Sequence, residues 1–447
     1  MSETKQWRVI PAVIMTAVMS FGGILVETSM NVTFPLLMSQ FNLLASQVQW
    51  VTTAYLLAVS IVVPSSAYLV RNFSIRNLFI TANLLFLSGL VIDSFAQSFI
   101  ILLLGRILQG FATGLALPLM FHIILTKVPQ DKRGLMMGVG SMTTSFAPAI
   151  GPTYGGILTE MLDWHAIFWL LLPLLVLSLA GGLWAIPQEP VGRREVFNWP
   201  AFIGLAAFLV TSLLAIEQNL WYQWMLAFLA AFAFYQSNRN NPLINLNLFS
   251  KGHYLVFLWG ALTYQALLLG MSFIIPNYLQ LGRGLSTTQA GNFMFLGPIV
   301  LSLVLPLAGR LYDSLGPKKP ILAGLTLSLF ALLIFVIYYH QLPIWSLLVV
   351  HVMMMLGIAL SLSNIMTHSY GQIEDKLEAD ANTLMNLGQQ YMGAISTALV
   401  SKLLSLGISQ NPEFGAVLGA RWGIILMFLL VLSAYILIII VFRSNTI

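Results

Sequence analysis

Long apolar runs fill most of the chain, and short segments rich in charged and turn-forming residues separate them. One helical crossing of a bilayer core of about 30 Å needs about 20 apolar residues. By this criterion the sequence predicts fourteen membrane-spanning helices, at residues 10–38, 46–69, 77–95, 98–126, 134–159, 165–186, 199–217, 220–237, 253–281, 288–312, 319–339, 343–370, 379–407 and 418–442. We therefore expect an all-α, polytopic membrane protein without a sizeable soluble domain.

Composition agrees with this expectation and excludes several classes of protein. Hydrophobic residues make up 58% of the 447 and charged residues 8%, which is unlike a soluble domain. The first apolar run lacks a small-residue cleavage site, so it predicts a retained helix and not a signal peptide. The absence of cysteine excludes disulfides and thiolate metal sites. No HExxH, Walker or nucleophile-elbow motif occurs, so the sequence predicts no enzyme and no ATP-driven pump.

Basic residues indicate an orientation and not a nucleic-acid partner. The 20 lysines and arginines are distributed over many short loops and form no single basic patch. With the N-terminus inside the cell, most of them fall on the cytoplasmic side, as the positive-inside rule requires. Both termini are therefore predicted to be cytoplasmic.

A repeat in two loops predicts the domain organisation. "AYLVRNFSIRN" (67–77) follows the second predicted helix, and "GRLYDSLGPKK" (309–319) follows the tenth. This spacing predicts an N-terminal six-helix half at 1–190, a linker with two extra helices at 191–245, and a C-terminal six-helix half at 246–447. Duplicated halves around a central site are typical of secondary transporters.

The stretch "ILVETSMNVTFP" (24–35) places Glu27 about three residues past the midpoint of the predicted first helix. An ionised acid there costs several kcal/mol unless it is paired or faces water, and protonation removes the cost. Glu27 is thus a candidate proton carrier, and no other acid lies so far inside a predicted span. The alternative is a structural acid bonded to a neighbouring helix. Asn31, one turn further on, would orient the carboxylate or contact a substrate.

Arg106 is the other charge well inside the first half, about eight residues into helix 98–126. Because a guanidinium does not lose its proton, it requires an acid, carbonyl groups or water. Glu27 is the simplest partner, and an anchor on backbone carbonyls is the alternative. Gln109 follows closely enough to contact the same groups.

Several motifs resemble those of one transporter family. They are the loop residues Gly309, Leu311, Asp313, Gly316, Lys318 and Lys319, and the stretches "RILQGFATG", "APAIGPTYGG", "ILVETSMNVTFP" and "DWHAIFWLLLP". On these motifs the chain resembles the major facilitator superfamily, and within it the fourteen-helix drug:proton antiporters of bacteria. The resemblance implies a role for Arg106 in proton transfer. Two departures are Val70 and Arg71, where the first-half loop usually has an acid, and Glu27, where the family usually has aspartate.

Small residues and prolines mark helix 134–159. Ala147, Gly151 and Gly155 recur every four residues, with Pro148 and Pro152 between them. This spacing permits close helix packing and bending. The resemblance to the antiporter motif implies a role in conformational change for Gly151, Pro152 and Gly155, and tight packing alone is the alternative.

Asp313 at the end of helix 288–312 is a candidate gate residue. A carboxylate there can face the N-terminus of the next helix, whose dipole favours negative charge. Lys318 belongs to the same candidate gate. The alternative is an ordinary loop acid paired with Lys318 or Lys319.

Neutral polar residues inside the second half are candidates for substrate binding, with Asn31 and Gln109 from the first half. These second-half candidates are Gln265, Asn277, Tyr278, Asn386 and Gln390. Interhelical hydrogen bonds are the commoner explanation for such residues. The 28 Phe, 14 Tyr, 11 Trp and 20 Met residues would suit a cavity for flat, apolar cations, and they would equally suit lipid contact.

The sequence as a whole predicts an antiporter of the bacterial cytoplasmic membrane that exports amphipathic, often cationic drugs and dyes by alternating access. The proton is the coupling ion, no cofactor is expected, and one chain would suffice. A dedicated exporter of one metabolite, lipid or amino acid on the same fold is the alternative. A membrane scaffold or receptor is a further one, against which the intramembrane charges argue.

Overall fold

A computed structural model describes residues 7–189, 196–239, 242–374, 377–411 and 414–444. Contacts divide the chain into two units, which are residues 1–33 with 50–243 and residues 34–49 with 244–447. The helices of the first unit are α1 (Val9–Met30), α4 (Trp50–Val62), η1 (Val63–Ser65), α5 (Ser66–Asn72), α6 (Ile75–Ser94), α7 (Phe99–Lys127), α8 (Gln130–Met161), α9 (Ala166–Trp169), α10 (Leu172–Ala185), α11 (Trp199–Gln218) and α12 (Trp221–Ser237). Those of the second are α2 (Phe34–Phe41), α3 (Ala45–Val48), η2 (Leu246–Ser250), α13 (Gly252–Leu281), α14 (Thr287–Leu315), α15 (Lys318–Tyr338), α16 (Ile344–Tyr370), α17 (Glu378–Gln410) and α18 (Gly415–Ser444).

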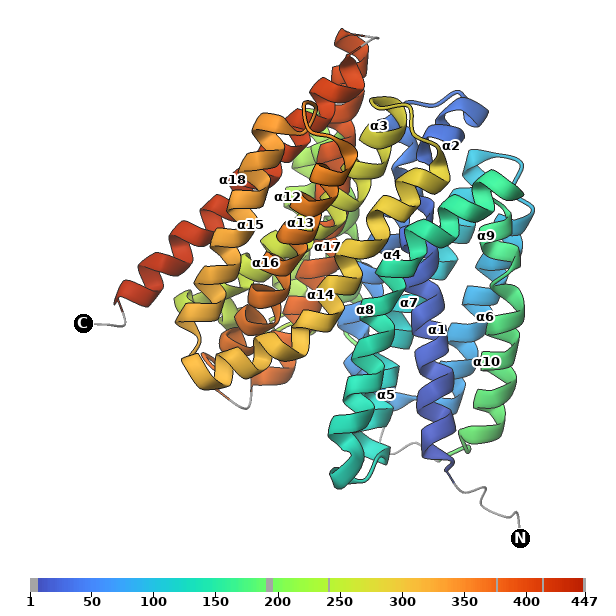
Figure 1. The fold of residues 1–447 in the computed structure, drawn as a ribbon. Helices are drawn as coiled ribbons and strands as arrows, with labels where there is room; N and C mark the ends of the chain where they lie inside the picture. The colour runs from blue at the N-terminus through green and yellow to red at the C-terminus, as the bar shows by residue number, and fades with distance from the viewer. Residues whose placement is uncertain (1–6, 190–195, 240–241, 375–376, 412–413, 445–447) are drawn as a thin grey trace. The chain divides into compact units, whose positions relative to one another are not determined.

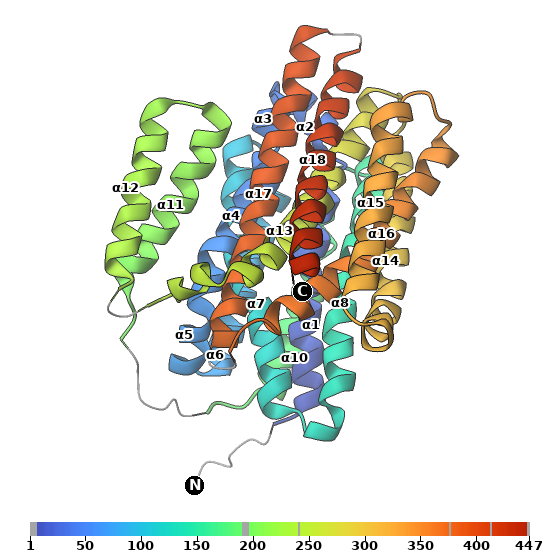
Figure 2. The same cartoon turned by 90° about the vertical axis from the view of Figure 1, so that its left-hand side faces the viewer.

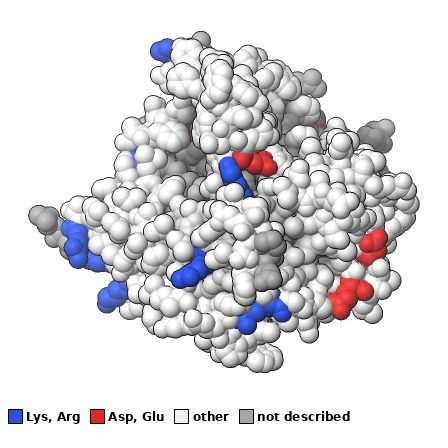
Figure 3. All heavy atoms as spheres, turned by 90° about the horizontal axis from the view of Figure 1, so that it is seen from above, with Lys and Arg blue, Asp and Glu red and all other residues white. Residues whose placement is uncertain are grey.

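The all-α prediction is confirmed, and the count of fourteen crossings is not. Every predicted span overlaps one or more helices, but in the described residues only twelve helical spans are long and apolar enough to cross a membrane. The two that are not among them are α8, which is rich in glycine, serine and threonine, and α12, which has only 17 residues. On the face seen in Figure 3, the few charged side chains lie scattered among uncharged ones.

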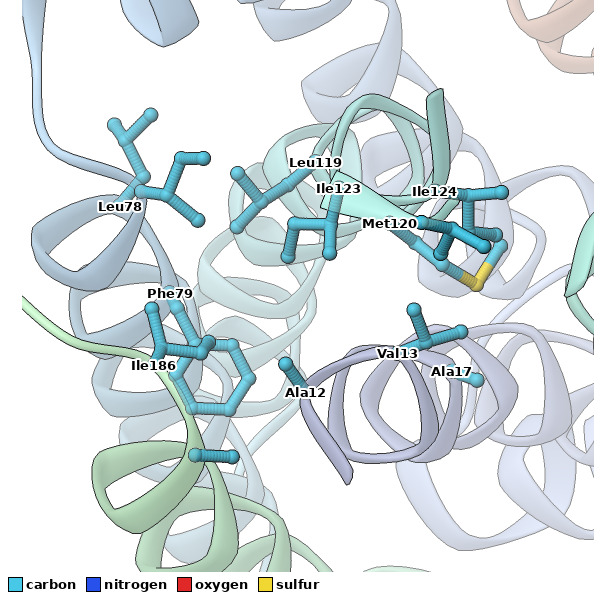
Figure 4. Packing of buried hydrophobic residues seen from close by; sticks show 13 residues of the cluster. Ala12, Val13, Ala17, Leu78, Phe79, Leu119, Met120, Ile123, Ile124 and Ile186 are labelled. Atoms are coloured by element: carbon cyan, nitrogen blue, oxygen red, sulfur yellow. The ribbon is translucent and has the colours of Figure 1, made fainter. Parts of the chain in front are cut away.

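Close apolar packing holds the first unit together. In Figure 4, Leu119, Met120, Ile123 and Ile124 of α7 lie on a face that packs with α1 and α6. Between helices in a membrane this cohesion comes from dispersion contacts, because lipid is as apolar as the side chains. Small residues allow the approach: a Cβ on Gly182 of α10 would lie 2.0 Å from the ring of Phe79.

Helices α11 and α12 form an antiparallel pair, visible on the left of Figure 2. Asn219 joins them in a left-handed conformation with φ of +54°, which asparagine tolerates. Contacts place the pair in the first unit, where the Trp50 indole at the start of α4 donates to Glu217 of α11 at 2.7 Å. The start of the predicted linker, residues 191–195, lies outside the described residues.

The first predicted span, 10–38, is interrupted, which corrects the predicted position of Glu27. Helix α1 ends at Met30, a turn covers 31–33, and α2 begins at Phe34. Pro35 has no N–H group, so a continuous helix would lack the bond to the carbonyl of Asn31. Glu27 therefore lies in the last turn of α1 and not near the middle of a long span.

The segment 34–49 groups with the second unit, although it follows α1 directly in sequence. Helix α2 packs on α13, where the rings of Phe34 and Phe273 lie 5.3 Å apart. Helix α3 packs on α17, and the Ser46 amide donates to the Ser405 hydroxyl at 2.9 Å. Nothing in the hydrophobic pattern predicts this grouping.

Within the second unit, glycines bring neighbouring helices close together. A Cβ on Gly324 of α15 would lie 2.4 Å from the carbonyl oxygen of Gly357 on α16. The turn from α14 to α15 uses Gly316 at φ of +74°, a conformation that favours glycine. In the matching loop of the first unit, Ser74 accepts a hydrogen bond from the Asn77 amide and caps α6. The second-unit loop therefore relies on a glycine with a positive φ, whereas the first-unit loop relies on a serine cap.

Candidate functional site

Among the described residues, the buried charged side chains all lie in the first unit. They are Glu27 of α1, Asp93 of α6 and Arg106 of α7, with exposed fractions of 8%, 0% and 0%. Figure 1 shows these helices side by side, and close contacts join α7 to both α1 and α6. Burial of three ionisable groups on adjacent membrane helices is costly and is typical of functional sites.

Helix α7 positions Arg106 and Gln109 three residues apart, on one face. The Arg106 Nη1 donates to Gln109 Oε1 at 2.6 Å, and its Nε donates to the Val51 carbonyl of α4 at 3.0 Å. The guanidinium also lies over the ring of Tyr55, 4.5 Å from its centroid. The alternative of an anchor on a backbone carbonyl is therefore observed, and the arginine also bonds a neighbouring amide.

Asp93 completes this cluster, and the sequence analysis missed it. Gln109 Nε2 donates to Asp93 Oδ2 at 2.8 Å, so one amide bridges the guanidinium and the carboxylate. Glycines make room for the bridge: a Cβ on Gly105 would lie 1.9 Å from Asp93 Oδ1, and one on Gly89 would lie 2.7 Å from Gln109 Cγ. Asp93 lies one residue from the end of α6. Acids at helix ends are commonly solvated, so this position gives no sign of burial in the sequence.

Glu27 stands close to this network without being bonded to it. It makes no hydrogen bond or ion pair with any described residue, although the charge of Arg106 acts on it. The direct Glu27–Arg106 pair that the sequence suggests is therefore absent from this structure. Arg106 Nη2 and Asp93 Oδ1 also lack hydrogen-bond partners in the described part of the chain.

The glycine motif of α8 packs against α1 directly beside Glu27. The Ser29 hydroxyl donates to the Gly151 carbonyl at 2.9 Å. A Cβ on Gly151 would lie 1.9 Å from Thr28 Oγ1, and one on Gly155 would lie 2.4 Å from the Ser29 carbonyl. Pro152 lies within the same helix. The close approach implied by the spacing is present, and the role of these residues in conformational change stays a prediction.

Asn31 lies in the turn after α1 and is buried. Its Oδ1 accepts a hydrogen bond from the Thr52 hydroxyl of α4 at 3.0 Å. This contact ties the turn after α1 to α4, the same helix whose Val51 carbonyl accepts a hydrogen bond from Arg106.

The second-unit candidates do not form one network. Asn277 is buried and donates to the Phe273 carbonyl of its own helix, while Tyr278 donates to the Tyr339 carbonyl at 3.2 Å and accepts from Arg283. Asn386 bonds the preceding turn of α17. The side chains of three candidates are half-buried: Gln265, Asn386 and Gln390.

The candidate gate residues Asp313 and Lys318 are exposed. In the described part of the chain neither forms an ion pair, so the alternative of a simple Asp313–lysine pair is not observed. Nor do the described residues contain a cluster of three His, Cys, Asp or Glu side chains that would hold a metal ion.

Comparison with known proteins gives a consistent result. Residues 16–397 match the sequence model described as Major Facilitator Superfamily. The chain is 31% identical over 426 residues to "Lincomycin resistance protein LmrB" of Bacillus subtilis (strain 168), covering 90% of this chain and 87% of that protein. It is 25% identical to "Putative multidrug resistance protein MdtD" of Pectobacterium atrosepticum, covering 89% and 87%.

Solved structures resemble this chain in fold. The crystal structure of the peptide transporter POT in complex with sulfate matches with a TM-score of 0.70 at 16% identity. The match covers 94% of each chain. At this identity the likeness concerns the fold and not the substrate.

Proposed function

Because this chain belongs to the major facilitator superfamily, we propose that it is a proton-coupled antiporter that exports amphipathic, often cationic drugs from bacteria. That it is a multi-pass membrane transport protein and not an enzyme is confirmed by the family. The observation that carries the proposal is the buried cluster of Glu27, Arg106 and Gln109. The printed names of the relatives support drugs as the cargo, with lincomycin the first compound to test.

The orientation predicted from the basic residues assigns a direction to the mechanism. With the N-terminus in the cytoplasm, α1 ends and α7 begins at the outer side, so Glu27 lies near the outside. A proton from outside neutralises Glu27. When Glu27 becomes open to the inside, loss of that proton leaves a carboxylate that attracts a cation. One proton entering down the potential supplies about 2.3 kcal/mol per 100 mV.

Proton flux into proteoliposomes tests the proposal. We expect lincomycin or a cationic dye to cause proton movement in vesicles with the native chain. Glu27→Gln should abolish this movement, because a glutamine side chain neither binds nor releases a proton in this pH range. Glu27→Asp should retain it. A full drug gradient formed by Glu27→Gln would contradict the role of Glu27.

A survival assay separates this function from its rival. Expression should protect cells against several unrelated amphipathic compounds if the chain is a multidrug exporter. Protection against one compound alone would favour a dedicated exporter on the same fold.

A further inference from the structure

Asp93 is a buried acid to which the proposed mechanism gives no role. Its carboxylate is fully buried and accepts a hydrogen bond from Gln109, while its second oxygen has no partner among the described residues. The bridging amide has a fixed direction, since Gln109 accepts from Arg106 and donates to Asp93. The amide dipole thus points its oxygen at the positive guanidinium of Arg106 and its amino group at the carboxylate of Asp93, an arrangement that favours a negative charge on Asp93.

Asp93 contributes a negative charge that can balance Arg106. Arg106 keeps its proton. If Asp93 is ionised, the cluster is neutral when Glu27 is protonated and carries one negative charge when Glu27 is ionised. Without Asp93 the cluster would carry a buried positive charge whenever Glu27 is protonated, and an uncompensated charge in the membrane is costly.

We infer that Asp93 is a positioning residue of the coupling site: through Gln109 it balances Arg106 while Glu27 holds a proton. Arg106 then alternates between the Gln109–Asp93 arm, seen here, and Glu27 after proton loss. Nη2 of Arg106, which has no hydrogen-bond partner in the part of the chain that the structure describes, is the donor available for that exchange. This inference rests on the proposed proton coupling.

Among the described residues, Arg106 of α7 is the charged group that acts on Asp93, and Glu27 of α1 and Tyr55 of α4 act in turn on Arg106. Helix α5, which also contacts α6, carries Tyr68 and Arg71. At the start of α9, His165 pairs with Asp163 and makes a 3.0 Å contact to the Ala96 carbonyl, three residues beyond Asp93. Helix α10, also packed on α6, carries no ionisable side chain.

An open cleft lies beside the α6 end that carries Asp93. It has a volume of about 450 Å³, and its lining includes Ser94, the neighbour of Asp93, and His165. Asp93 itself is sealed from the cleft, as its exposed fraction of 0% shows. Solvent therefore reaches the adjacent residue but not the carboxylate, which keeps the electrostatic interaction with Arg106 strong.

The test is the pH profile of drug transport in Asp93→Asn. With the counter-charge removed, Arg106 would pair with Glu27 at all times, and Glu27 would release its proton more readily. We expect the pH of half-maximal transport to fall by about one unit or more, the size of effect that a neighbouring charge produces. Uniformly reduced transport with an unmoved profile would show a structural role and overturn the inference.

Gln109→Met provides a second test of the bridge, and Glu160→Gln is its control. Gln109→Met breaks the bridge while keeping a side chain of similar length, so it should move the profile in the same direction even if Asp93→Asn does not fold. Glu160→Gln removes an exposed carboxylate of the same unit and should leave the profile unchanged. An unchanged profile in Gln109→Met would overturn the inference.

Failure of the proposed function gives a different result. If the native chain shows no drug-dependent proton flux, proton coupling itself is wrong. If the native chain shows flux and Glu27→Gln does not, while Asp93→Asn and Gln109→Met match the native profile, only the role of Asp93 is wrong. Drug binding in detergent, followed by tryptophan fluorescence against pH, gives a readout independent of transport.

Discussion

The interiors of the two units differ in kind, although their loops repeat. The first unit buries an arginine and two acids, and Gln109 links Arg106 to Asp93. In the described part of the second unit no Asp, Glu, Lys or Arg is buried. There His351 is fully buried with neither ring nitrogen hydrogen-bonded, and Asn277 bonds only its own helix through its amino group. Buried charges require partners, whereas single neutral polar groups are tolerated at smaller cost.

This difference suggests that the two units have different roles in transport. Proton chemistry requires groups that change charge, and the described interior of the first unit supplies them. A neutral interior imposes no strong charge preference on its contents, which suits varied amphipathic cargo.

Arg106→Met should have the largest effect. It leaves Asp93 and Glu27 buried without a positive charge, and removal of one partner from a buried charged group costs about 3–5 kcal/mol. We expect loss of transport and a clearly lower melting temperature in detergent. Arg106→Lys should fold better but transport poorly, because lysine lacks the fork that reaches Gln109 and Val51 together. Native stability in Arg106→Met would show that the network is dispensable.

Gly155→Val should abolish transport by separating α8 from α1 next to Glu27. Its Cβ would lie 2.4 Å from the Ser29 carbonyl, which belongs to backbone and moves only with the helix. Overpacking of this kind costs about 1–3 kcal/mol. Gly309→Ala in the second unit is the control, since apart from chain neighbours and the backbone of its own helix no described atom lies within 4 Å of its added Cβ. Transport assays on both variants compare the two positions, and equal activity would argue against a critical α1–α8 contact.

His351→Leu should leave proton-coupled transport intact and raise the melting temperature slightly. The imidazole lacks hydrogen bonds to described residues, and a buried polar group without a partner destabilises a protein by about 1–3 kcal/mol. Thermal unfolding and proton flux measured on the same preparation check both parts. Loss of drug-driven proton flux would place proton chemistry in the second unit and end the contrast.

Glu189→Gln should have the smallest effect, visible only in the pH dependence of stability. Burial alone would raise the pKa of Glu189, but hydrogen bonds from Lys127 and Trp7 and the charge of Lys127 lower it overall. A lowered pKa in the folded state adds stability above the ordinary value near 4.5, and this stability is lost as pH falls through the folded value.

Melting curves between pH 7 and acid measure this effect. The native chain should lose its small advantage over Glu189→Gln as pH falls, and added salt should reduce the advantage because Glu189 is partly exposed. A constant difference at every pH would exclude an ionic origin.

The functional residues differ in how far sequence alone could find them. Glu27 and Arg106 stand out because a charge inside a long apolar run is rare. Asp93 does not, because it lies next to a helix end, where acids are ordinary. Its burial follows from the side-by-side packing of α6 and α7, which the glycines at 89 and 105 permit. Such a contact joins residues that no periodicity connects.

The sequence alone was enough to predict an all-helical membrane protein with charges inside its first half, and its motifs indicated the major facilitator superfamily. Apolar run length and intramembrane charge are local properties that the bilayer makes decisive. Helix packing sets three further features: α1 ends before Phe34, residues 34–49 pack with the second unit, and Gln109 joins Arg106 to Asp93 and not to Glu27. Each depends on which helix faces which, and close packing between distant segments sets that.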